Sequence, residues 1–332
     1  MPQKILINNE SSLVVGVGSA LVDILLRESD EFLAATGAVK GGMTFVEPEE
    51  MEMILSRSSQ SPSMVPGGSA CNTIIGIGKL GGHARFIGKR GGDKLGIMLD
   101  DSLKNQSVEP VLEISDLIPT GRVLSIITPD AQRTMLTFLG AASETSSGEM
   151  TPEKFQGAAI VHIEGYLLFN EELIFAALEA AKEAGALISL DLASFTVVEA
   201  SKDIITNIVR NYVDILLANE DEAKAYTGIK DEEKSLLKLA DDAEIAVLKV
   251  GKRGSYVARN GNICRIGIKG DGSAIDTTGA GDLWASGFLY GLVNNMPIEK
   301  CGEIAAACGH DVCQMIGAHI PEQGWDRIKT LI

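Results

Sequence analysis

Residues 276–282 combine glycines and carboxylates directly before an apolar run, 283–292, that predicts a helix. Small residues at the start of a helix let its first amides converge on an anion, where the positive end of the helix dipole also points. The segment is therefore a candidate phosphate site. Asp282 would repel a bound phosphate but is well placed to take a proton from an attacking hydroxyl, which makes it a candidate general base. The alternative is a turn in which Asp282 only caps the helix.

A second glycine-rich segment lies near residue 70. Gly67 and Gly68 let a ligand approach the backbone, and the amide of Asn72 can both donate and accept hydrogen bonds. Further on, residues 76–81 match the spacing of the dinucleotide-binding fingerprint. That motif needs a strand directly before its first glycine, whereas the preceding residues here are a Gly-Gly loop and the start of a helix. We interpret 76–81 as small residues on a closely packed helix.

Polar residues also follow two of the strands expected in the second half. Asn219 and Glu222 come directly after the strand expected at 213–218, and ligands gather at this end of the strands in a parallel sheet. These side chains could hold Mg²⁺ through water, or they could cap the next helix. Lys249, Gly251 and Gly254 lie in the turn after the next strand, and this composition suits polyphosphate binding. A surface hairpin would have a similar composition.

Several common chemistries have no support in the sequence. Cys308, His310, Cys313 and His319 lack a standard metal-ligand spacing, and helix packing explains them. The five cysteines contain no CxxC pair, which fits a reducing compartment. The patterns GxSxG and GxxxxGK[ST] are absent, which removes the most common hydrolase and NTPase interpretations.

Charge and composition narrow the class of partner. The 332 residues are 45% hydrophobic and carry a net charge of -16, which repels nucleic acids and anionic membrane surfaces. We expect no nucleic-acid or membrane partner. No signal-peptide pattern opens the sequence and no apolar run reaches the roughly 20 residues of a spanning helix, so we expect a cytoplasmic protein.

The order of the elements predicts the architecture. From residue 158 onward, strand-like segments at 158–163, 186–192, 213–218 and 244–250 alternate with helical ones, which predicts a mostly parallel sheet covered on both faces. In the first third, 13–17 and 21–26 are strand-like, and 122–138 reads as a hairpin. We expect such segments to pair into a small sheet that acts as a lid. We expect one domain, 1–332, in which the lid is formed by segments near 19–46 and 108–138.

Taken together, these features resemble the PfkB, or ribokinase-like, family of carbohydrate and nucleoside kinases over essentially the whole chain. One motif runs from Gly67 to Gly91 and the other from Asp276 to Gly287. Within the family the sequence is most similar in style to adenosine kinases. The resemblance implies an α/β ribokinase-like fold, with a central, mostly parallel sheet flanked by helices and a small β-sheet lid.

The resemblance also implies roles for individual residues. Asp282 would deprotonate the acceptor hydroxyl, and Arg133, on a lid strand, would reach toward the phosphates. The amides that stabilise the transferred phosphoryl group would be those of Gly279, Ala280 and Gly281. The substrate would contact Ser19, Asp23, Gly67, Gly68, Asn72 and Tyr166. ATP and Mg²⁺ would be bound around Asn219, Glu222, Lys249, Gly251, Gly254 and His310. Asp276 and Thr278 lie where many members bind a monovalent cation such as K⁺.

The expected activity is ATP-dependent phosphorylation of a primary hydroxyl on a ribose-containing substrate, adenosine or a related nucleoside in the first place. A free furanose such as ribose or fructose is the alternative, because Ser19 replaces the Asn usual in adenosine kinases. Tyr166 and Phe195 could stack on a base or could be plain core residues. From other classes, a non-catalytic sensor and a dehydrogenase stay open, although a sensor has no need of Asp282. The expected partners are a small-molecule substrate and ATP, and both a monomer and a homodimer are open.

Overall fold

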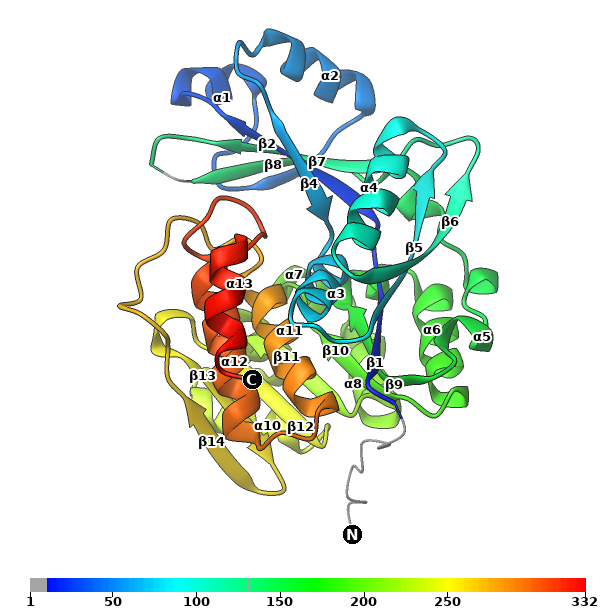
Figure 1. The fold of residues 1–332 in the computed structure, drawn as a ribbon, viewed down its shortest axis with the longest axis vertical. Coiled ribbons are helices and arrows are strands. Elements are labelled where there is room, and N and C mark those ends of the chain that lie inside the picture. Colours follow the sequence, from blue (N-terminus) through cyan, green and yellow to red (C-terminus); the bar gives the residue numbers. More distant parts are fainter. Residues whose placement is uncertain (1–10, 131) are drawn as a thin grey trace.

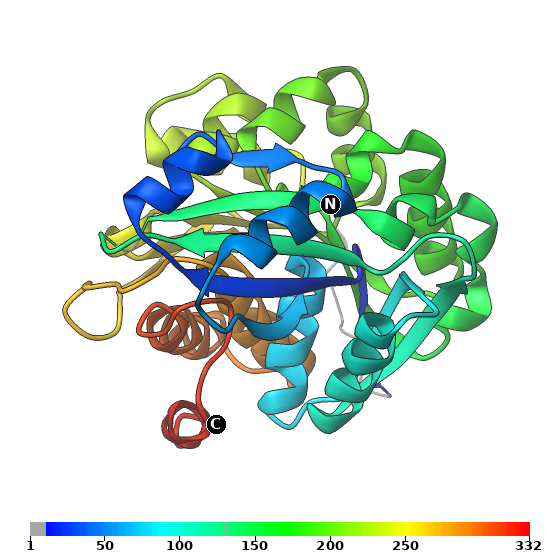
Figure 2. The ribbon, with the colours of Figure 1, turned by 90° about the horizontal axis from the view of Figure 1, so that it is seen from above.

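The computed structural model describes residues 11–130 and 132–332. Their strands form two sheets, one of nine strands in the order β14-β13-β12-β11-β10-β9-β1-β5-β6 and one of five in the order β3-β8-β7-β2-β4. Figure 1 shows the small sheet above one end of the large sheet, and Figure 2 looks down on it from above. A mostly parallel sheet flanked by helices, with a second smaller sheet, confirms the predicted architecture.

The large sheet is parallel except at one edge, where β13 and β14 run antiparallel. Its inner strands are largely apolar on both faces, because helices cover both. In β9, Ile160 belongs to one core and its neighbour Val161 to the other. The strands are β1 (Leu13–Val17), β5 (Ala84–Gly91), β6 (Val108–Ser115), β9 (Ala158–Glu164), β10 (Leu187–Asp191), β11 (Ile215–Asn219), β12 (Ile245–Lys249), β13 (Ser255–Arg259) and β14 (Asn262–Ile266).

The helices divide between the two cores. The first core contains α3 (Ser69–Lys79), α4 (Lys94–Asn105), α11 (Ala280–Val293), α12 (Ile298–Val312) and α13 (Glu322–Lys329). The second contains α5 (Pro152–Phe155), α6 (Glu171–Glu183), α7 (Phe195–Ala200), α8 (Lys202–Tyr212), α9 (Glu220–Thr227) and α10 (Glu232–Ala240). Short 3₁₀ turns are η1 (Gly140–Glu144), η2 (Ser147–Glu149), η3 (Gly165–Phe169) and η4 (Gly251–Arg253). None of the helices in 11–130 and 132–332 has the length and apolar character needed to cross a bilayer.

The small sheet covers its outer face with two helices of its own. Ile24 and Leu26 lie on this outer face and pack with residues of α1 (Asp30–Thr36) and α2 (Pro48–Arg57). Asp23 and Leu25 alternate with them and lie on the other face. The strands are β2 (Leu21–Arg27), β3 (Met43–Phe45), β4 (Ser63–Gly67), β7 (Gly121–Ile127) and β8 (Arg133–Phe138). β7 and β8 form the predicted antiparallel hairpin.

The boundaries expected for the lid need three corrections. Residues 108–115, inside the expected lid range, pair as β6 with β5 of the large sheet. Residues 13–17 form β1, an interior strand of the large sheet between β9 and β5, with Val14, Val15 and Val17 buried. The edge strand β4 at 63–67 joins the small sheet without having been expected there.

Within 11–130 and 132–332 the chain passes four times between the sheets. We call 18–20, between β1 and β2, and Gly68, between β4 and α3, the front crossings. The back crossings are 116–120, between β6 and β7, and Leu139, between β8 and η1.

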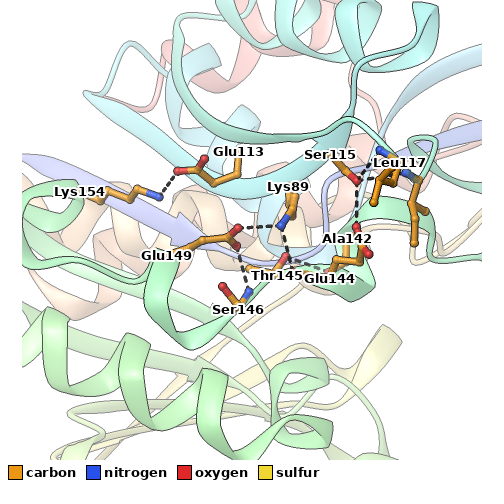
Figure 3. Close-up of polar contacts among 11 residues, drawn as sticks. Lys89, Glu113, Ser115, Leu117, Ala142, Glu144, Thr145, Ser146, Glu149 and Lys154 are labelled. Atoms are coloured by element: carbon orange, nitrogen blue, oxygen red, sulfur yellow. Dashed lines mark hydrogen bonds and ion pairs between the residues drawn. The ribbon is translucent and has the colours of Figure 1, made fainter.

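Side chains of the large sheet hold the segments beside the back crossings. Lys89 of β5 donates to Glu149 Oε1 at 2.7 Å and to the carbonyl of Glu144 at 3.1 Å, and Ser115 Oγ donates to Glu144 Oε2 at 2.9 Å (Figure 3). The chain that returns from β8 is therefore fixed to the edge formed by β5 and β6.

Helices α11 and α12 pack so closely that backbone meets backbone. A Cβ added to Gly287 of α11 would lie 2.7 Å from the N and Cα atoms of Ala305. Gly76 of α3 likewise faces α11, since a Cβ added there would lie 2.3 Å from Ser286 Oγ. The prediction of a closely packed helix holds for 76–79, whereas Gly81, with a φ of 91°, lies beyond the end of α3.

We therefore expect Gly287→Val to lower the free energy of unfolding by about 1–3 kcal/mol, because the new side chain must push α12 away. Urea unfolding followed by circular dichroism measures the change. Gly148→Ala is the matched control, since an added Cβ there meets nothing within 4 Å. An unfolding midpoint unchanged by Gly287→Val would contradict the close packing of α11 on α12.

Candidate active site

Four neighbouring strands of the large sheet end in polar residues on the same face. The register pairs Glu164 of β9 with Asp191 of β10, and Asn219 of β11 with Lys249 of β12. This face belongs to the core that contains α3 and α11. The carboxyl ends of parallel strands thus gather acids, an amide and an amine where ligands bind in such sheets.

Asp282 joins this row from the first turn of α11. Ser69 Oγ donates to its Oδ1 at 2.8 Å and Asn72 Nδ2 donates to its Oδ2 at 2.9 Å. Burial raises the pKa of Asp282 to about 6, the two hydrogen bonds lower it, Asp191 raises it and Lys249 lowers it. The two glycine-rich segments, 210 residues apart, therefore meet in one side-chain cluster.

The N-terminus of α11 offers open amides beside Asp282. Among the hydrogen bonds of residues 11–130 and 132–332, the N–H groups of Gly279, Gly281 and Asp282 have no acceptor. The N–H of Ala280 donates to Thr277 O at 3.1 Å, so this amide, included in the sequence prediction, is engaged in a turn. Gly279 has a φ of 71°, which suits glycine. Open amides at a helix N-terminus are groups that can bind an anion.

A buried ion pair lies beneath this helix start. Lys249 Nζ donates to Asp191 Oδ2 at 2.7 Å, and a Cβ added to Gly281 would lie 3.1 Å from Lys249 Nζ. The ammonium lowers the pKa of Asp191 although burial opposes this. Burial lowers the pKa of Lys249, whereas Asp191, Glu222 and Asp282 raise it, with a net increase. One ammonium thus compensates several carboxylates.

Asn219 and Glu222 form a capping box on α9. Asn219 Oδ1 accepts the N–H groups of Asp221 and Glu222, both at 3.0 Å, and Glu222 Oε2 accepts the N–H of Asn219 at 2.8 Å. The capping interpretation therefore holds locally. Burial, followed by the nearby Asp191, raises the pKa of Glu222 to about 7. Such a carboxylate gains from an additional cation nearby.

Direct metal ligation has no support in the same region. No group of three or more His, Cys, Asp or Glu side chains within 11–130 and 132–332 is arranged to hold a metal ion. The C-terminal cysteines and histidines accordingly form no such cluster. The carboxylates of Glu222 and Asp191 fit Mg²⁺ only as oxygen donors that act through its water shell.

Asp23 approaches from the small sheet. Its side chain lies against Gly67, where an added Cβ would be 2.4 Å from Asp23 Oδ1. Burial raises the pKa of Asp23 to about 7, the positive charge of Arg133 lowers it, and Asp282 raises it. Asp23, Arg133 and Asp282, all predicted site residues, therefore lie close enough for their charges to interact.

One buried acceptor in the site has no partner. Asn72 is 6% exposed, and its Oδ1 has no hydrogen-bond partner among the described residues although its Nδ2 binds Asp282. A buried acceptor of this kind costs free energy unless a ligand donates to it. Asn72 Oδ1 is thus suited to accept from a substrate hydroxyl.

Two acids of the site, Glu164 and Asp191, were not predicted from the sequence. Glu164 accepts the N–H groups of Ser19 at 2.8 Å and Ala70 at 3.0 Å, and burial raises its pKa. Asp191 holds Lys249. Both are single acids at the end of an apolar strand, and the positional rule applied to Asn219 would have found them.

The two aromatic residues considered for base stacking are not core residues. Tyr166 is 41% exposed and Phe195 is 48% exposed. Burial raises the pKa of Tyr166 to about 12, with further contributions from Glu164 and Asp282, so this side chain lies beside the acidic cluster. The interpretation of Tyr166 and Phe195 as plain core packing is wrong.

The remaining predicted residues lie in the turn after β12, on α12 and in the loop before α11. Gly251 and Gly254 have φ values of 53° and 96° in the turn after β12. The His310 ring, on α12, lies next to Gly270, whose added Cβ would be 2.3 Å from it. Asp276 accepts from Thr278 through N–H and Oγ1 and from the N–H of Gly317, so its carboxylate holds the loop together.

A cavity of about 640 Å³ lies at the far end of the small sheet. None of the predicted site residues lines it. Its walls include Arg27, Gln60, Ile127, Ile275 and Ile316.

Comparison with known proteins gives sequence relatives over most of the chain. Residues 30–323 match the model of the pfkB family carbohydrate kinase. A 5-dehydro-2-deoxygluconokinase from Geobacillus thermodenitrificans (strain NG80-2) is 28% identical over 256 residues, covering 73% of this chain and 76% of that protein. The probable fructokinase-7 from Arabidopsis thaliana is 29% identical over 291 residues, covering 80% and 83%.

Solved structures agree over almost the full length. The crystal structure of adenosine kinase from Sinorhizobium meliloti has a TM-score of 0.88 at 30% identity and covers 97% of this chain and 100% of its own. A probable sugar kinase protein from Rhizobium etli CFN 42 gives the same values. With this fold and the family match over 30–323, the chain belongs to the pfkB family of carbohydrate kinases, phosphotransferases that act on an alcohol group.

Proposed function

We propose that this chain transfers the γ-phosphoryl group of ATP to a primary hydroxyl of a ribose-containing substrate, with Asp282 as the general base. The observation that carries the proposal is the Asp282 carboxylate, held by Ser69 and Asn72 beside the open N–H groups that begin α11. A base and an anion site in contact are what phosphoryl transfer to an alcohol requires.

The residues divide the work of the reaction between them. The substrate hydroxyl gives its proton to Asp282 while its oxygen attacks the γ-phosphorus, and the bond from that phosphorus to the bridging oxygen of ADP breaks. The open amides of Gly279 and Gly281 stabilise the negative charge on the transferred group. Asp23 and Asn72 Oδ1 accept hydrogen bonds from the other sugar hydroxyls, and Arg133 adds positive charge from the small sheet.

Mg²⁺ and the nucleotide belong on the side of α11 that faces Lys249 and Glu222. Lys249 supplies the cation nearest to Gly281, and Asp191 holds it there. Asn219 and Glu222 would hold Mg²⁺ through water, and when bound this ion neutralises phosphate charge. The turn with Gly251 and Gly254 and the nearby His310 would border the nucleotide. A K⁺ ion at Asp276 and Thr278 rests on the family resemblance alone.

The acceptor we favour is adenosine or a related nucleoside. The exposed rings of Tyr166 and Phe195 support this choice, because a planar base gains by stacking on such rings. The adenosine kinase from Sinorhizobium meliloti is 30% identical to this chain. A free furanose is the second candidate, since the sequence relatives include a probable fructokinase.

We expect Asp282→Asn to lower kcat by about 10²- to 10⁴-fold, because the amide cannot take the proton while it keeps the size of the side chain. Turnover is measured as ADP release, and ATP binding and the circular dichroism spectrum should stay unchanged. Asp311→Asn, a buried acid paired with Arg327 on α12 and α13, is the control and should keep its activity. A kcat near the wild-type value in Asp282→Asn would contradict the role of Asp282 as general base.

The pH dependence follows from the raised pKa values. Asp282 and Asp23 act as carboxylates, so kcat/KM for the acceptor should fall as the pH drops through a range between about 6 and about 7. Lys249→Met should move this acid limb to higher pH, because the ammonium lowers the pKa of Asp282. Lys238→Met, which changes an exposed side chain of α10, should leave the acid limb in place. A profile that is flat between about pH 5 and pH 8 contradicts the proposal.

A substrate panel separates the candidates. With ATP as donor, adenosine should give a higher kcat/KM than ribose or fructose, and Tyr166→Ala should raise the KM for adenosine about tenfold by loss of stacking while the KM for ribose stays unchanged. A higher kcat/KM for a free sugar overturns the nucleoside assignment. Saturable nucleoside binding without turnover of any acceptor would instead favour a sensor.

A further inference from the structure

Glu164 holds both front crossings with one carboxylate. Its Oε1 accepts the N–H of Ser19 at 2.8 Å, in the connection from β1 to β2. Its Oε2 accepts the N–H of Ala70 at 3.0 Å, in the first turn of α3 and two residues after Gly68. Glu164 is 1% exposed, so these contacts lie inside the protein where hydrogen bonds to a charged group are strong.

The backbone around Glu164 leaves no room for further side chains. A Cβ added to Gly18 would lie 2.3 Å from Glu164 Oε2. Gly68 has a φ of 102°, and a Cβ there would lie 2.1 Å from Ser19 O. The two crossings therefore touch each other and Glu164 directly, and a movement of the carboxylate moves both.

The front crossings separate the two halves of the candidate site. On the small-sheet side, Asp23 follows the first crossing and Gly67 precedes the second. On the large-sheet side, Ser69 and Asn72 follow the second crossing and hold Asp282. The position of Asp23 relative to Asp282 is thus set where Glu164 binds the backbone.

The back crossings are held differently. Asp93 accepts from the N–H and Oγ1 of Thr120, and Lys89 and Ser115 bind Glu149 and Glu144. Several side chains share that task, and no predicted substrate residue lies in those segments. At the front crossings, by contrast, a single carboxylate, that of Glu164, accepts from the backbone on both.

We propose that Glu164 is a positioning residue, whose carboxylate fixes the small sheet so that Asp23 and Asp282 hold one acceptor together. The kinetic part rests on the proposed function, which assigns Asp23 and Asp282 their roles. The contacts to Ser19 and Ala70 do not depend on it.

The test is Glu164→Gln in the full chain. Gln has one acceptor oxygen, and its NH₂ group would face a second donor, so one of the two N–H groups loses its acceptor. Hydrogen exchange of peptides covering Ser19 and Ala70 should become about tenfold faster, since a buried donor is left unpaired. The KM for the acceptor should rise about tenfold while the KM for ATP stays unchanged.

Glu149→Gln is the matched control, because this carboxylate binds Lys89 and the N–H of Ser146 beside the back crossings. It should change neither KM nor the exchange at Ser19 and Ala70. If Glu164→Gln does not fold, Gly18→Ala presses on the same carboxylate and should give the same exchange and KM changes.

The proposal is overturned if the amides of Ser19 and Ala70 exchange at the wild-type rate in Glu164→Gln. It is also overturned if exchange is faster but the acceptor KM is unchanged, or if the KM values for the acceptor and for ATP change equally. Exchange is measured without substrate. A wild-type protein without turnover would therefore overturn the proposed function, while the exchange data would still decide whether Glu164 holds the crossings.

Discussion

The site depends on the burial of several carboxylates around a single ammonium. Asp191, Glu222 and Asp282 all act on Lys249, while Asp23 and Glu164 lie in the same region without a direct ion pair in the described residues. Charges removed from water are costly unless paired. Three features offset this cost in part: the Asp191–Lys249 pair, the N-termini of α3 and α11, and the raised pKa values of Asp23, Glu222 and Asp282.

The same arrangement explains how a strongly acidic protein can accept an anion. The net charge of -16 repels phosphates at a distance, but open amides at the start of α11 and the ammonium of Lys249 supply positive charge beside the carboxylates. Close packing of α11 on α12 at Gly287, and of α3 on α11 at Gly76, keeps those amides over the strand ends. The packing of these helices therefore also sets the geometry of the site.

Local patterns allowed much of this to be predicted from sequence. The glycine-rich start of α11, the strand and helix alternation after residue 158 and the β7–β8 hairpin depend on neighbouring residues, and each was found. The assignment of strands to sheets depends on pairing between distant segments, so β6 was assigned to the lid and β4 was not expected. The engagement of the Ala280 amide depends on turn geometry that no residue pattern reveals. Glu164 and Asp191 are single acids at the ends of apolar strands, so no motif marks them and only the strand-end rule points to them.

The central claim is that Asp282 is a buried carboxylate whose pKa is raised by its surroundings. A pH titration of the ligand-free protein with ¹³C-labelled aspartate carboxyl groups, followed by NMR, tests it most directly. One resonance should titrate at about 6 and be missing from Asp282→Asn. If the resonance lost in that variant titrates at or below the usual aspartate value of about 3.9, the electrostatic account of the site is contradicted.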